Sequence, residues 1–212
     1  MIVPLLIFAA AAPPANPSLQ GIVSADDYPA WAADEGQQGT TGFELLIGTD
    51  GKVQRCTVLV SSGFPRLDSY TCDLIKRRAV FEKAVDDHGN PAYGIYRSAM
   101  SWSLGGPGRQ LELSPDLELQ INQAPAGVSL PLEFRVAYMT SATGAMSGCK
   151  VAYAAKPAPK ELVDLACQTF GQGPPEIVHD LTGKPVAAWI VSSVRFTQDP
   201  VTRSTAPSPA SP

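Results

Sequence analysis

Four cysteines and two histidines are the residues in this 212-residue sequence best suited to metal binding, redox chemistry or cross-linking. The cysteines are Cys56, Cys72, Cys149 and Cys167. No pair of them forms a C-x-x-C motif, which disfavours a zinc ribbon or a thioredoxin-like centre. His88 and His179 lie in polar, turn-like stretches, so we expect no metal site. In an oxidising compartment two disulfides are expected, and four cysteines allow three connectivities; two buried pairs of free thiols are the alternative.

Serine chemistry is not favoured either. A hydrolase needs a nucleophile with a placed base, and the sequence contains no G-x-S-x-G, H-E-x-x-H or phosphate-binding glycine loop. Ser61-Ser62-Gly63 fits a strand-to-helix turn better than a nucleophile. We therefore expect a protein that is not an enzyme and that needs no cofactor.

The cysteines are the landmarks of an internal repeat. Gly51 precedes Cys56 by five residues and Gly144 precedes Cys149 by five, and the Leu67–Cys72 spacing recurs as Leu162–Cys167. Gly89-Asn90-Pro91 recurs as Gly183-Lys184-Pro185. Landmarks in the same order at nearly constant offset indicate a duplicated unit. The repeat selects the pairs Cys56–Cys72 and Cys149–Cys167.

Each copy has the same expected elements around its cysteines. Two strands joined by a tight turn come first, because Asp50-Gly51 between apolar runs is a strong hairpin signal. A helix with an apolar face follows, and a glycine- and proline-containing turn leads to a third strand. The expected strands are 42–47, 53–60 and 93–104 in the first copy and 132–139, 146–152 and 186–196 in the second. The predicted fold class is α+β: two tandem β-β-α-β units, each a three-stranded antiparallel sheet with a helix packed on one face.

The sequence outside the repeat predicts an exported protein. An apolar run from Ile2 ends in alanines and is too short to cross a bilayer, as expected of a signal peptide, although no Lys or Arg precedes it. The formal charge of −4 gives no basic stripe for nucleic acid. The expected organisation is a signal peptide (1–15), a first domain (24–104), a linker and lead-in (105–127), a degenerate second unit (128–198) and a disordered tail (199–212).

The first unit resembles the C-terminal domain of TonB, in a variant with paired cysteines. The resemblance rests on Tyr28-Pro29, Thr49-Asp50-Gly51-Lys52-Val53, Ser61-Ser62-Gly63, Leu67-Asp68, Arg77-Arg78-Ala79-Val80-Phe81 and Asp87-His88-Gly89-Asn90-Pro91. The second unit matches only through the internal repeat, so it is expected to be a degenerate copy.

The resemblance implies a periplasmic, non-enzymatic protein that binds peptide segments of outer-membrane or other envelope proteins, with self-association possible. In this family the peptide pairs with an exposed strand of the domain, which is a case of sheet augmentation. By position the exposed strand is the third one, so the expected binding residues are Tyr93, Ile95, Tyr96 and Arg97. The alternative for this strand is an ordinary sheet position whose edge the second unit covers.

Two other functions stay open from the sequence. A genuine energy-transducer component of TonB-dependent outer-membrane transport needs a membrane anchor and a long proline-rich spacer, which the apolar start does not provide. That alternative therefore requires an anchor upstream of Met1. A purely structural envelope protein is the other alternative.

Overall fold

The structure is a computed structural model of the chain. It describes Pro13 and residues 22–105 and 114–198. Most of the expected signal peptide, residues 106–113 of the expected linker and the whole expected tail therefore lie outside the described residues. Within them, no helix is both long enough and apolar enough to span a membrane.

The described part of the first half of the chain contains two short helical segments, a long helix and four strands. Its Pro65 occupies the first turn of the long helix, where a missing N–H costs little. The elements are η1 (Ala25–Asp27), α1 (Ala30–Asp34), β1 (Gly39–Ile47), β2 (Val53–Val60), α2 (Pro65–Arg78), β3 (Ala84–Val85) and β4 (Pro91–Trp102).

The second half repeats the strand–strand–helix–strand core of this order. It adds β5 at its start and a separate short strand before its last strand, and its described residues include no counterpart of η1 and α1. Its elements are β5 (Leu117–Ile121), β6 (Leu132–Thr140), β7 (Met146–Ala154), α3 (Lys160–Gln172), β8 (Val178–His179), β9 (Pro185–Val186) and β10 (Ala188–Gln198). The order β1-β2-α2-β4 thus recurs as β6-β7-α3-β10. The strand β5 lies inside the range expected to be the linker and lead-in, and it pairs in parallel with the end of β10.

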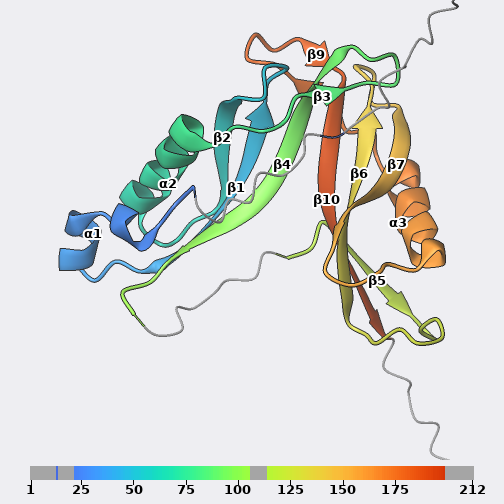
Figure 1. Cartoon of the computed structure of the whole chain (residues 1–212), viewed down its shortest axis with the longest axis horizontal. Coiled ribbons are helices and arrows are strands. Elements are labelled where there is room, and N and C mark those ends of the chain that lie inside the picture. The colour runs from blue at the N-terminus through green and yellow to red at the C-terminus, as the bar shows by residue number, and fades with distance from the viewer. Residues whose placement is uncertain (1–12, 14–21, 106–113, 199–212) are drawn as a thin grey trace, which may run out of the picture.

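The two halves share a single sheet, which corrects the expectation of two separate three-stranded sheets. The strand order is β2-β1-β4-β10-β6-β7, with β3 added to β4 and β5 added to β10. The junction is a short parallel ladder between β4 and β10, and the other pairs along that path are antiparallel. The order is therefore symmetric about the β4–β10 junction (Figure 1).

The two long helices lie on opposite faces of this sheet. Side chains alternate between faces along each strand, and Tyr96, Val191 and Ala137, which lie side by side in neighbouring strands, all join the core cluster of Ile75 from α2. The residues one position earlier in β4 and β10, Ile95 and Ile190, join the cluster of Leu162 and Ala166 from α3. Each helix thus buries one half of one face.

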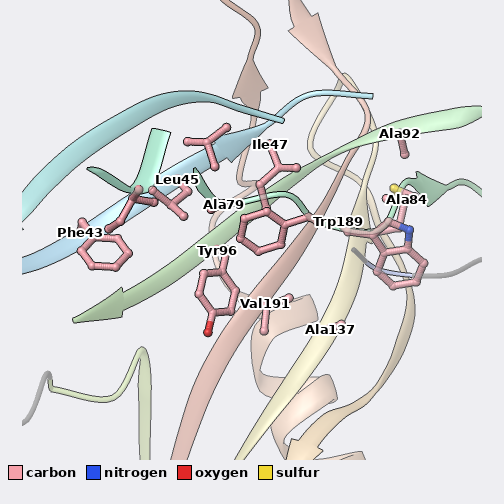
Figure 2. Close-up of a cluster of buried hydrophobic side chains, with 14 residues drawn as sticks. Phe43, Leu45, Ile47, Ala79, Ala84, Ala92, Tyr96, Ala137, Trp189 and Val191 are labelled. Atoms are coloured by element: carbon pink, nitrogen blue, oxygen red, sulfur yellow. The ribbon is translucent and has the colours of Figure 1, made fainter. Parts of the chain in front are cut away.

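The core on the α2 side runs without interruption from the first half into the second. Figure 2 shows this cluster extending from Phe43, Leu45 and Ile47 of β1 through Tyr96 of β4 to Val191 and Trp189 of β10. Trp189 is fully buried, and its indole N–H donates to the backbone oxygen of Val85 at 2.9 Å. A tryptophan of the second half therefore completes the core of the first.

Both disulfides selected by the repeat are present. Cys56–Cys72 ties β2 to α2, and Cys149–Cys167 ties β7 to α3. The described cysteines include no free thiol. One bridge therefore fastens each helix to the outer strand of its own half.

Candidate functional site

The edge of β4 that was expected to bind a peptide is divided in two. Tyr93 to Tyr96 pair in parallel with Ala188 to Val191 of β10. From Arg97 to Trp102, β4 pairs with β1, and no strand among the described residues pairs with its other side. Figure 1 shows β4 curving away from β10 beyond the paired stretch. We call this divergence the fork.

Three of the four expected binding residues lie on the covered side of the fork. Ile95 and Tyr96 are buried in the two opposite cores, and Tyr93 is half-buried against the α3-side core. These three residues were expected to lie on an exposed strand edge. In the structure β10 pairs with that edge instead. Arg97 is the first residue of β4 beyond the β10 ladder.

Arg97 is held by three carboxylates from different parts of the chain. Its guanidinium lies 2.9 Å from Glu44 of β1, 3.2 Å from Asp116 before β5 and 2.9 Å from Glu176 after α3. Burial lowers the pKa of Arg97, but the hydrogen bond and charge of Glu176, with the charges of Asp116 and Glu44, raise it above its usual range. Arg97 is therefore a permanent cation that fastens both halves together at the fork.

Glu176 also holds Tyr138 of β6 in place. The Tyr138 hydroxyl donates to the Glu176 carboxylate at 3.1 Å, and the Thr140 hydroxyl donates to the Glu176 backbone oxygen at 2.6 Å. Burial, together with the negative charge of Glu176, raises the pKa of Tyr138 to about 12. This phenol is therefore a neutral donor at physiological pH.

Asp116 closes the opposite wall of the fork, on the β10 side. Its carboxylate accepts from the backbone N–H and from the hydroxyl of Ser193, each at 2.7 Å. From Val194 onward β10 pairs with β5. The edge of β10 facing the fork is thus satisfied, whereas the facing edge of β4 has no strand partner in the described part of the chain.

A cavity of about 580 Å³ occupies the fork. Its walls come from both halves and are largely apolar. The lining residues are Leu59, Val60, Arg97, Ser98, Ala99, Ser114, Pro115, Asp116, Glu133, Phe134, Arg135, Tyr153, Ala155, Ser193, Val194 and Arg195. A volume of this size suits a short peptide segment or a small ligand.

Arg135 of β6 lies at the closed end of this cavity. Its guanidinium carbon is 5.3 Å from the centre of the Tyr96 ring, a cation–π distance. Neither Arg135 nor Asp116 was among the residues predicted from the sequence. A basic residue inside the apolar run 132–139 was the available signal for Arg135, whereas Asp116 carried none, because its role depends on a contact with β10.

Residues 24–104 match the family model described as Gram-negative bacterial TonB protein C-terminal. This part of the chain is therefore similar to the C-terminal domain of TonB. The matched range covers β1, β2, α2 and β4 and ends two residues after β4. No curated protein and no solved structure matches the chain significantly.

The most specific motif of the TonB-like half has a structural role. Asp68, in the first turn of α2, accepts from the Ser62 backbone N–H at 2.9 Å and from the hydroxyls of Thr41 and Ser61. The Ser-Ser-Gly turn is therefore held to the helix by one buried carboxylate. Ser61 donates to that carboxylate, so its hydroxyl is positioned for the turn and not for attack on a substrate.

Neither histidine is among the residues that line the cavity at the fork. His88 and His179 are both exposed. Among the described residues, no group of three or more His, Cys, Asp or Glu side chains is arranged to hold a metal ion. The cavity at the fork is the candidate site, with largely apolar walls and arginine side chains among its lining residues.

Proposed function

We propose that this protein is a periplasmic, TonB-like, non-enzymatic binding protein that takes an extended peptide segment along β4 at the fork. Its partners are segments of outer-membrane or other envelope proteins. The observation that carries the proposal is the unpaired edge of β4 from Arg97 to Trp102, next to a cavity lined by both halves.

An added strand gains main-chain hydrogen bonds from such an edge, and the cavity receives its side chains. Ser98 and Ala99 of β4 line the cavity, and Leu59 and Val60 bring exposed apolar surface to it from β2. An open strand edge beside exposed apolar side chains is a liability unless something covers it. Of the expected binding residues, Arg97 lines this cavity. Tyr93, Ile95 and Tyr96 pack in or against the two cores next to it.

Export to the periplasm is supported by both disulfides. Structural disulfides persist in oxidising compartments and are rare in the reducing cytosol. The TonB family match agrees with a location in the Gram-negative envelope.

A photo-crosslinking amino acid at position 98 tests this function in cells. Ser98 lines the cavity, whereas Thr143 lies exposed in the turn between β6 and β7 and serves as the matched control. We expect adducts from position 98 whose partner peptides, sequenced by mass spectrometry, are extended segments of envelope proteins. Equal adducts from both positions, or none from position 98, would overturn the proposal.

A further inference from the structure

The fork imposes an end on any strand that pairs with β4. The ladder between β4 and β10 is complete up to Tyr96 and Val191, so a guest strand that pairs from Arg97 onward cannot continue past Tyr96 within the sheet. Either the guest chain terminates there or it must turn out of the sheet plane. A chain terminus is the simpler solution for a strand addressed to this edge.

The charge at the closed end selects which terminus fits. Among the described residues, three arginines line the cavity, and two of them already hold carboxylates: Arg97 with Asp116 at 3.2 Å, and Arg195 with Glu133 at 2.6 Å. Arg135 is the remaining one, and among the described residues no carboxylate is paired with it.

Arg135 also stands at the right place for this role. Its half-buried guanidinium lies over the ring of Tyr96, the last β4 residue covered by β10. The carboxylates of the walls, Asp116 and Glu133, are both engaged by other arginines, so neither neutralises it. A carboxylate brought to this end forms a charge-assisted hydrogen bond in a largely apolar cavity.

We propose that the fork binds a free C-terminus: an extended peptide runs antiparallel to β4 and presents its terminal carboxylate to Arg135. This inference rests on the proposed strand addition and adds its direction, its terminus and the residue that recognises it. The apolar walls, including Phe134 and Val194, receive the side chains of the last few residues of the guest.

Two peptide pools test the proposal on the full chain. Both contain eight-residue peptides randomised at every position, one with free C-termini and one with C-terminal amides, and retained peptides are identified by mass spectrometry. We expect retention from the free-carboxylate pool and little from the amide pool. For a retained peptide, Arg135→Ala should weaken binding by roughly 10- to 100-fold, since a hydrogen bond to a charged group is lost.

Two further variants make the result specific to recognition. Arg135→Lys keeps the cation and should retain part of the affinity, whereas Lys184→Ala removes the same charge from an exposed turn and should change nothing. Equal retention of both pools with no effect of Arg135→Ala would leave strand addition standing and overturn C-terminal recognition. No retention from either pool, together with adducts at position 98, would also overturn it, whereas failure of both experiments would overturn the proposed function as well.

Discussion

Tyr96 and Val191 form the last pair of the parallel ladder between β4 and β10, and Arg97, the next residue, pairs only with β1 among the described strands. At this point β4 changes from a sealed half, which pairs with strands on both sides, to an open half, which pairs with β1 only among the described strands. The sealed half joins the TonB-like segment to the rest of the chain in one sheet, and the open half borders the cavity. The stability of this protein and its proposed binding therefore depend on the same junction.

Trp189 should be the most sensitive position for the union of the two halves. Replacing it with Ala removes a fully buried indole from the α2-side core and should lower the free energy of unfolding by about 3–5 kcal/mol. Urea unfolding followed by circular dichroism measures this. Trp189→Phe keeps most of the volume and loses the hydrogen bond to Val85, so its smaller loss serves as the comparison. A loss below about 1 kcal/mol for the alanine variant would mean that the halves are not packed on each other as described.

Removing one disulfide should destabilise the chain through its unfolded state. The Cys149–Cys167 bridge closes a loop of 18 residues, for which the chain-entropy estimate is about 3 kcal/mol. The Cys149→Ala/Cys167→Ala double variant should show this loss in urea unfolding. The Cys56→Ala/Cys72→Ala variant, with a separation of 16 residues, is the matched comparison and should lose a similar amount. A much larger loss in one of them would point to a role beyond loop closure.

Arg97→Leu should be destabilising because it leaves three carboxylates gathered without their cation. The guanidinium is partly exposed, so we expect a loss of about 1–3 kcal/mol, below the range for fully buried pairs. Thermal or urea unfolding provides the value. Lys160→Ala breaks an exposed pair with Asp164 and should stay within about 0.5 kcal/mol of the parent. Equal effects of the two variants would show that the Arg97 cluster contributes no more than a surface ion pair.

Asp68 should make stability fall at acid pH. Burial alone raises its pKa, but the hydrogen bonds from Ser61, Ser62 and Thr41 lower the pKa below the ordinary value of 3.8. The carboxylate therefore stabilises the fold fully above about pH 4, and this contribution is lost as the pH falls through the lower pKa of the folded state.

The Asp68→Asn variant isolates that contribution. It should lower the free energy of unfolding at pH 7 by about 2 kcal/mol, and its difference from the parent chain should shrink as the pH drops below about 4. Urea unfolding across pH 2–7 measures both, with Asp164→Asn on an exposed helix face as the control. A pH-independent difference would show that the carboxylate charge has no part in holding the turn.

Local patterns predicted the elements of each half well. The expected strand 53–60 is β2 as observed, and Leu67, Thr71, Leu74 and Ile75 form the buried face of α2. In α3 the expected apolar face is less complete, since Leu165 is 38% exposed. The alternating residues Leu117, Leu119 and Ile121 were a strand signal for β5 that the glycine- and proline-rich surroundings obscured.

The junction and the site could not be predicted in the same way. Pairing of β4 with β10 joins residues about 95 positions apart in the sequence, and no residue pattern in either strand predicts that the two strands pair. From its sequence, each strand is predicted only as the third strand of its own unit. Arg135 acquires its role only through that pairing, because it brings Tyr96 under the guanidinium. Asp116 acquires its role through the pairing of β5 with β10, which places it beside Ser193.

Residue-resolved amide hydrogen exchange along β4 in the free protein distinguishes a paired edge from an open one at the fork. We expect slow exchange from Tyr93 to Tyr96, and from Arg97 to Trp102 fast exchange at those alternate amides that point away from β1. Uniform protection of β4 as far as Trp102 would contradict the open edge, because it would mean that the edge at the fork is already covered.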